Sequence, residues 1–374
     1  MTVGMYTTVG GRCGIADYTA ALTSALGASA DVRTVAIRPG TWSPLALARA
    51  GARLSGSRVA HVQHTYSFFG VDHLTYTIAM RVLRARIRSP LVITAHTVRP
   101  PGPARYPGGA GSALANALGA PRWHDVETFA RAQAVIVHAR LHRDRLLARG
   151  VEAGRCRVIP PGVPPRVVVP ASAAARFRTR HGLAARPVVG VFGFLERSKR
   201  FATVLDALRE TGRGSEAPVL LLAGGPRLPE HDAIEREIRA DAARVGLADR
   251  VVITGYLAPD EVPVALEAMD VVAVPYATDD SVSYSLHVAL AQRRPVVATD
   301  LDPMREIDER GHCLALVRAG DPHDLAKTLR GLLEDEPRRA RLAEAAAQYA
   351  DAASVAVTAR LTLDTYAAVA PGAA

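Results

Sequence analysis

The chain has 374 residues, 49% of them hydrophobic, which is enough for two domains of about 150–200 residues each. A net charge of +10 suggests a polyanionic partner, yet only two of the 46 basic residues are lysines and the arginines are spread along the chain. Because aromatic residues make up only 5%, no platform for stacking nucleic-acid bases is expected. Composition therefore argues against a nucleic-acid-binding protein.

The cysteines and the N-terminus indicate the compartment. Cys13, Cys156 and Cys313 are far apart and form no CxxC pair, which favours reduced cytoplasmic thiols and argues against a zinc site. The segment 1–6 lacks the features of a signal peptide, and no run approaches the ~18 apolar residues of a membrane span. The arginines of segment 81–88 indicate a solvated basic face, with peripheral contact to an anionic membrane as the alternative.

Short apolar runs alternate with longer amphipathic ones in the first half, a pattern typical of α/β proteins. The helix after the first strand has apolar residues at helical spacing from Ile15 to Leu26. Further helices are expected at 74–85, 126–131 and 142–148, and strands at 2–6, 32–37, 59–63, 91–94, 134–137 and 157–159.

A proline-rich segment, 160–165, interrupts this series and is predicted to be an interdomain linker. The second series has strands at 187–192, 219–223, 251–253, 271–274 and 295–298, and helices at 201–210, 231–245, 260–268, 285–291 and 341–353. We expect two doubly wound Rossmann-like domains facing across a cleft. Their predicted bounds are 1–165 and 166–354, with a C-terminal helix at 355–374 as a candidate to complete the first.

The most informative segment runs from Asp279 to Leu286, between an apolar strand and a helix. Ligands bind at this carboxyl edge of a parallel sheet, and a helix N-terminus suits a phosphate. Ser281 and Ser283 add hydroxyl donors, and Asp280 can accept hydrogen bonds from sugar hydroxyls. The segment predicts a phosphorylated, polyhydroxylated ligand, although an ordinary capped helix start explains the same residues.

Other candidate site residues follow strands in the first half. A glycine-rich loop that includes Gly11 and Gly14 opens the first helix, where a phosphate or sugar can approach bare backbone; tight strand–helix packing is the alternative. His64, His96 and His138 each close a strand, as polar caps or as groups in the cleft. His96 is the preferred candidate for the reacting centre.

The second half offers cations and an acid. The loop with Arg197 and Lys199 can neutralise a diphosphate leaving group, or it is a solvated basic loop. Lys199 is the stronger candidate because lysine is so rare in this chain. Glu306 is a donor-site candidate or only a helix-start acid.

Taken in order, these segments resemble family 4 of the nucleotide-sugar-dependent glycosyltransferases, which have the GT-B fold and retain anomeric configuration. The matching motifs run nearly end to end: Gly10-Gly11 with Gly14-Ile15-Ala16, Gln63-His64 with Phe69-Gly70, Thr94-Ala95-His96-Thr97, Val158 to Val163, Gly193 with Lys199, Gly255-Tyr256, and Asp270 with Pro275.

The resemblance assigns roles to particular residues. It implies that Gly11 and Gly14 border the donor phosphates and acceptor, and that His96 hydrogen-bonds the donor sugar. Lys199 would bind the diphosphate with Ser281 and Ser283, and we group Arg197 and Glu306 with these donor residues. Asp280 matches the first acid of the family's paired-glutamate motif, and His64 and His138 are assigned to the acceptor side.

Two departures concern the donor. Val288 stands where the family has its second acid, so the usual ribose contact is missing. Phe194 stands where the family has an arginine, leaving Arg197 or Arg200 as substitutes. These changes bear on nucleotide and sugar preference more than on the fold.

The implied reaction moves a glycosyl group from a nucleotide diphosphate sugar to a hydroxyl of a small molecule or glycan. It needs no cofactor or metal, because cations and a helix dipole stabilise the departing diphosphate. No carboxylate is an obvious nucleophile, which favours front-face transfer with retention. The alternatives are a nucleotide-sugar epimerase or sugar phosphorylase of the same fold, and a nucleotide-binding relative without catalysis.

Overall fold

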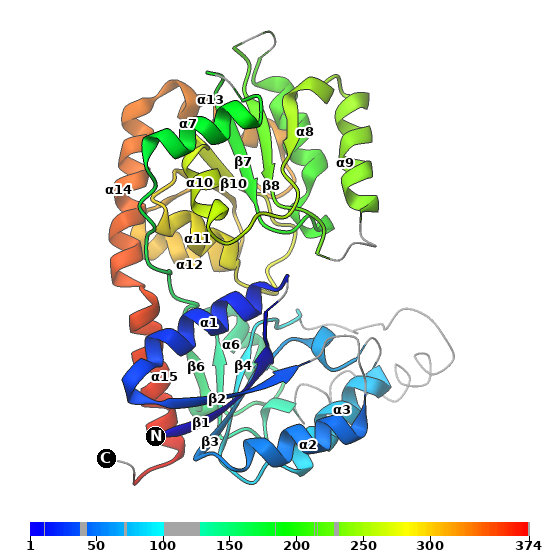
Figure 1. Cartoon of the computed structure of the whole chain (residues 1–374), viewed down its shortest axis with the longest axis vertical. Helices are drawn as coiled ribbons and strands as arrows, with labels where there is room; N and C mark the ends of the chain where they lie inside the picture. Colours follow the sequence, from blue (N-terminus) through cyan, green and yellow to red (C-terminus); the bar gives the residue numbers. More distant parts are fainter. Residues whose placement is uncertain are drawn as a thin grey trace. The chain divides into compact units, whose positions relative to one another are not determined.

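The computed structural model describes residues 1–372 except 11, 38–42, 71–72, 101–127, 184, 213, 215 and 228–231. It divides into two compact units. The first comprises Met1–Pro161, Asp280–Val282 and Val355–Ala374, and the second comprises Gly162–Asp279 and Ser283–Ser354. Each contains a six-stranded parallel sheet covered by helices (Figure 1), which confirms the expected pair of doubly wound α/β folds.

The sheet of the first unit has the order β2-β1-β3-β4-β5-β6, all pairs parallel. Most of its strands are buried on both faces, as expected of parallel strands covered by helices. The strands are β1 (Thr2–Thr8), β2 (Asp31–Ile37), β3 (Val59–His64), β4 (Leu91–Ala95), β5 (Ala134–Val137) and β6 (Cys156–Val158).

The helices of the first unit are α1 (Gly14–Leu26), α2 (Pro44–Leu54), α3 (His73–Ala85), α6 (Arg140–Leu147) and α15 (Val355–Val369). Helices α2 and α3 pack together, and their apolar residues share one core cluster with the sheet. Helix α1 packs against α15 instead, so the C-terminal helix returns to the first unit (Figure 1).

The sheet of the second unit has the order β12-β11-β10-β7-β8-β9. The chain order reverses between β10 and β7, and such a switch point is where ligands bind in open α/β sheets. The strands are β7 (Val188–Phe192), β8 (Val219–Ala223), β9 (Val251–Ile253), β10 (Val271–Val274), β11 (Val296–Thr299) and β12 (Leu314–Val317).

The helices of this unit are α7 (Ala171–Arg180), α8 (Phe201–Glu210), α9 (Ala233–Arg244), α10 (Glu261–Glu267), α11 (Tyr284–Ala291), α12 (Asp302–Gly311), α13 (Pro322–Glu334) and α14 (Glu336–Ala352). Apolar residues of α8, α9 and α13 form one core cluster with the sheet, and α14 packs on α11, α12 and α13. Among the described residues, no helix is long and apolar enough to cross a membrane.

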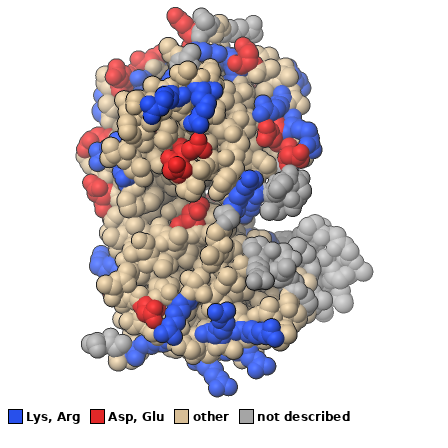
Figure 2. Space-filling model, in the orientation of Figure 1, with Lys and Arg blue, Asp and Glu red and all other residues tan. Residues whose placement is uncertain are grey.

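Surface charge differs between the two units. On the face shown in Figure 2, acidic and basic side chains are interspersed over the second unit, where several form ion pairs within one helix. The first unit carries exposed arginines on α2, on α3 and on the turn that follows, namely Arg49, Arg53, Arg81, Arg86 and Arg88. The interpretation of segment 81–88 as a solvated basic face stays a prediction.

Some elements were not predicted. Strand β12 has the sequence LALV, whose four apolar residues have no periodicity that separates a strand from a helix. Helix α7 buries only Phe177, so it has no apolar stripe. Helices α2, α12 and α13 were also missed, although each has a proline in its first turn. The predicted helix 126–131 lies partly outside the described residues.

Candidate functional site

The loop after β7 and the start of α11 meet at the carboxyl edge of the second sheet. Gly193 follows β7 with φ of 100°, and its amide donates to the Ala223 carbonyl at 3.0 Å. A Cβ at Gly193 would lie 2.6 Å from Ser285 Oγ and 2.9 Å from Lys199 Nζ. Only glycine therefore fits here, between a hydroxyl and an ammonium group.

Lys199 is an unusual lysine because it is only 3% exposed. Its ammonium group donates to the Phe192 carbonyl at 2.7 Å and lines a small hollow with Val191, Tyr276 and Ser285. Burial lowers the pKa of Lys199 to about 7, while Glu196 opposes the shift and Arg227 adds to it. A cation held this way gains strongly from an anionic ligand.

The N-terminus of α11 is capped by Ser283. Its Oγ accepts from the Leu286 amide at 3.1 Å and donates to Tyr276 Oη at 3.1 Å. Burial raises the pKa of Tyr276, and hydrogen bonds to Ser283 and Ser285 oppose that rise. Ser283 thus orients the helix end, whereas Ser285, which sequence reasoning did not select, lines the hollow beside Lys199.

Two glycines hold the loops after β7 and β8 together. A Cβ at Gly224, whose φ is 153°, would lie 2.2 Å from the Gly193 carbonyl oxygen. The Leu195 amide also donates to the Gly225 carbonyl at 3.0 Å. A strand-end Gly-Gly is common loop geometry, so the sequence alone gives no sign of this contact between the two loops.

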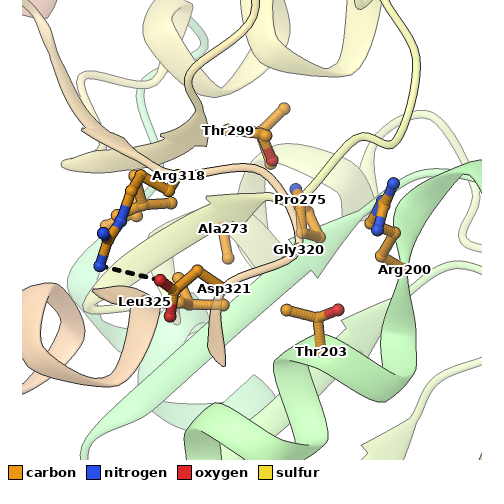
Figure 3. A pocket seen from close by; sticks show the side chains of 12 residues that line it. Arg200, Thr203, Ala273, Pro275, Thr299, Arg318, Gly320, Asp321 and Leu325 are labelled. Atoms are coloured by element: carbon orange, nitrogen blue, oxygen red, sulfur yellow. Dashed lines mark ion pairs between the residues drawn. The ribbon is translucent and has the colours of Figure 1, made fainter. Parts of the chain in front are cut away.

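A second hollow lies where β10, β11 and β12 end (Figure 3). Arg318 and Asp321 form an ion pair of 2.8 Å on one side of it, and Arg200 and Thr203 line another part. Asp321 also caps α13 by accepting from the Asp324 amide at 3.0 Å. Because an acid occupies this helix N-terminus, the second hollow is less suited to a phosphate than the one at Lys199.

In the first unit, two predicted histidines are brought together. His96 Nδ1 and His138 Nε2 are 3.2 Å apart, and His138 Nδ1 donates to the Ile159 carbonyl at 2.8 Å. His96 Nε2 hydrogen-bonds the side-chain amide of Gln63 at 2.8 Å, and Tyr18 packs edge-on against both rings. Both ring nitrogens of His96 thus have protein partners, so contact with a sugar requires exchanging one of them.

The partly exposed ring of His96 ends a buried polar network. His61, which is fully buried in β3, hydrogen-bonds Tyr366 Oη through Nδ1 at 2.6 Å and Thr94 Oγ1 through Nε2 at 2.7 Å. Burial lowers the pKa of His61 to about 3, and burial reinforced by His138 lowers the pKa of His96 well below its usual value. Both imidazoles are therefore neutral at pH 7.

Replacing Tyr366 by phenylalanine should destabilise the protein by about 1–3 kcal/mol, because His61 Nδ1 would be left buried without its partner. Chemical denaturation followed by circular dichroism measures this. Tyr349→Phe is the matched control, since the buried Tyr349 hydroxyl has no hydrogen-bond partner among the described residues. Equal stability of the two variants would contradict the assigned role of the His61–Tyr366 bond.

The third predicted histidine lies elsewhere. His64 is fully buried, stacks on Phe69 with ring centroids 5.4 Å apart, and hydrogen-bonds Tyr76 Oη through Nε2 at 2.8 Å. Burial lowers its pKa to about 3, with the positive charge of Arg99 contributing. These contacts support a role in packing more than direct contact with an acceptor.

The remaining candidates are dispersed. The Asp280 carbonyl accepts from the Val98 amide at 2.7 Å, and Ser281 forms a β-bridge with Thr97, all within the first unit. Gly14 begins α1 with open space where a Cβ would be. Gly11 lies outside the described residues.

Two donor candidates of the second unit have other partners. Arg197 is 72% exposed and pairs with Glu237 at 2.8 Å. Glu306 lies one turn into α12, is buried, and accepts from Arg310 at 2.5 Å. Among the described residues, no group of three His, Cys, Asp or Glu side chains is placed to hold a metal.

Comparison with known proteins matches both halves of the chain. A model described as glycosyltransferase family 4 matches residues 38–167, and one described as glycosyl transferases group 1 matches residues 186–335. A D-inositol 3-phosphate glycosyltransferase from Xylanimonas cellulosilytica is 31% identical over 306 residues, which cover 77% of this chain and 69% of that protein. The chain belongs to glycosyltransferase family 4.

Other relatives of this family 4 chain match over shorter regions. An alpha-D-kanosaminyltransferase from Streptomyces kanamyceticus is 29% identical over 174 residues, 46% of this chain and 43% of that protein. The chain thus spans less than half the length of this relative. The fold extends further: the structure of Anabaena HepE in complex with UDP and glucose superposes with a TM-score of 0.76 at 20% identity, covering 98% of this chain and all of that one.

Proposed function

We propose that the chain transfers a glycosyl group from a nucleotide diphosphate sugar to an acceptor hydroxyl, with retention and without a metal ion. The observation that carries the proposal is Lys199, a buried lysine with its ammonium group beside Ser285 at the switch point of the second sheet. A buried cation is costly unless an anion compensates it. The HepE structure, with UDP and glucose, supports a nucleotide sugar as that anion.

The chemistry follows from where charge develops. As the glycosidic bond to the diphosphate breaks, negative charge grows on the leaving oxygen. Lys199 Nζ and Ser285 Oγ can donate to the diphosphate, and the N-terminus of α11 adds a favourable dipole. These groups do what a bound divalent cation does in other transferases. His96, partly exposed, is the proposed contact for the donor sugar.

The acceptor is proposed to be a small polyhydroxylated molecule or a glycan. The X. cellulosilytica relative is named for D-inositol 3-phosphate, a ring carrying several hydroxyls. A neutral imidazole such as His96 can accept a hydrogen bond from such hydroxyls. Release of nucleoside diphosphate only when an acceptor is present would separate a transferase from an epimerase.

A thermal-shift panel of UDP, GDP, ADP and TDP, each with and without EDTA, tests the donor site. We expect one nucleotide to raise the unfolding temperature, because a ligand that binds the native state but not the unfolded chain stabilises the native state by mass action. We also expect this shift to survive EDTA, since the proposed site uses no metal ion. A shift abolished by EDTA would contradict metal independence. If no nucleotide shifts the unfolding temperature, the assignment of the donor site to Lys199 is wrong.

One observation favours a second candidate, a nucleotide-binding protein without catalysis. Val288 on α11 stands where the family places an acid. Such a protein would bind a nucleoside diphosphate but release none from a nucleotide sugar, whichever acceptor is supplied.

A further inference from the structure

Lys199 alone brings one positive charge to a leaving group that carries about two to three negative charges, so a second cation is expected nearby. Two arginines of the same loop point elsewhere. Arg197 is largely exposed and pairs with Glu237. Arg200 packs on Gly320, since a Cβ added at Gly320 would lie only 2.8 Å from Arg200 Nη1. Arg200 also lines the hollow of Figure 3.

Arg227 reaches the loop after β7 from the neighbouring strand. It follows β8 through Gly224-Gly225-Pro226, and its guanidinium lies over the Phe194 ring, 5.1 Å from the centroid. Its Nη2 donates to Glu196 Oε1 at 2.6 Å. Stacking on an aromatic face leaves the N–H edges of a guanidinium free to point sideways, and the carboxylate fixes one of them.

The Arg227 guanidinium has more N–H donors than the hydrogen bond to Glu196 uses. Arginine carries five N–H groups, and Glu196 is the hydrogen-bond partner seen for Arg227. Its Nε is shielded from solvent and has no hydrogen-bond partner among the described residues. A buried donor without a partner is costly, so the side chain is poised for an acceptor that the protein itself does not supply there.

Arg227 and Lys199 belong to one electrostatic cluster. The two loops that carry them are joined by the Leu195–Gly225 hydrogen bond and by the contact of Gly224 with Gly193. Arg227 also contributes to the low pKa of Lys199, so the two positive charges sense each other. An anion between them would relieve that repulsion.

We propose that Arg227, held by Phe194 and Glu196, is the second cation of the diphosphate site and contacts the donor together with Lys199. This inference rests on the proposed function and deepens it. Phe194 then serves as the platform that places a guanidinium from the next loop, which explains an aromatic residue at the mouth of a phosphate site.

Titration calorimetry with the nucleoside diphosphate selected from the panel tests the proposal. Arg227→Gln should weaken nucleotide binding about tenfold or more, and Arg227→Lys should weaken it less. The control is Arg239→Ala, which should leave the affinity unchanged, because Arg239 is an exposed arginine of α9 that pairs with Glu235. The exchange variant F194R/R227F returns a guanidinium to the loop of Lys199. Its affinity for the nucleoside diphosphate should be at least a third of the wild-type affinity, and therefore higher than that of Arg227→Gln.

The outcomes separate the two claims. If the wild type binds a nucleoside diphosphate and Arg227→Gln and Arg227→Ala bind it within twofold of the wild type, Arg227 is not the second cation and the proposed function stands. If the wild type binds none of the four nucleotides, both fall. Circular dichroism of each variant confirms folding, and because Arg227 is part-exposed, two substitutions are available should one fail to fold.

Discussion

Replacing Lys199 by methionine should lower the rate of glycosyl transfer about 10²–10³-fold, the usual cost of removing one group aimed at charge that develops in the transition state. Methionine keeps the length of the buried chain and removes the ammonium group that lies at the Phe192 carbonyl. Steady-state kinetics with a nucleotide sugar and a polyol acceptor measure the effect. Lys327→Met is the matched control, since Lys327 is the one other lysine and lies exposed on α13.

The pH dependence of binding gives a second readout of the same group. The pKa of Lys199 is lowered to about 7, and a bound diphosphate would raise it again by favouring the charged form. Binding above pH 7 therefore takes up a proton, and affinity for the nucleoside diphosphate should fall as pH rises from 7 toward 9. Lys199→Met should lose this dependence. An identical pH profile for both proteins would exclude Lys199 from the site.

Replacing Gly224 by alanine should destabilise the second unit by about 3 kcal/mol and abolish nucleotide binding. The new Cβ would meet the Gly193 carbonyl oxygen at 2.2 Å, and φ of 153° is unfavourable for a residue with a side chain. The loops after β7 and β8 must then separate, which moves Arg227 away from Phe194. Urea denaturation and calorimetry measure the two effects.

Gly246→Ala separates backbone strain from the loop contact. Gly246 also has positive φ, at 75°, but has no described atom within 4 Å of its would-be Cβ. This variant should lose about 1 kcal/mol and keep its nucleotide affinity. A Gly224→Ala protein that behaves like Gly246→Ala would show that the contact with Gly193 is dispensable.

Most strands were predictable because parallel strands buried on both faces are apolar runs bounded by turns. The predicted bounds of β5, β8, β9 and β10 agree with the structure. Helix α7, with one buried apolar residue, and β12, with four apolar residues, carry too little periodicity to be assigned. Most buried strands were therefore found and these weakly patterned elements were missed, whereas α2, α12 and α13 were missed although each has apolar residues on one face and a proline in its first turn.

The sequence pointed to parts of the candidate site where one residue is locally unusual. A rare lysine after a strand and three histidines at strand ends stood out, and the structure places Lys199 in a hollow and His96 against His138. Partnerships between distant segments could not be read from spacing. The contact of Arg227 with Phe194 and the burial of His64 among aromatic rings depend on how separate loops pack.

Because α15 packs in the first unit, the first unit can complete its folding only after the second unit has been synthesised. The hydrogen bond between His61 and Tyr366 joins residues 305 positions apart, and Arg58 reaches the Ala370 carbonyl across 312. A ribosome finishes the whole second unit before the last helix of the first emerges. Until then, His61 and the face of the first unit that packs against α15 stay exposed. During this period, binding of a chaperone or rapid folding of the second unit would protect the first unit from aggregation.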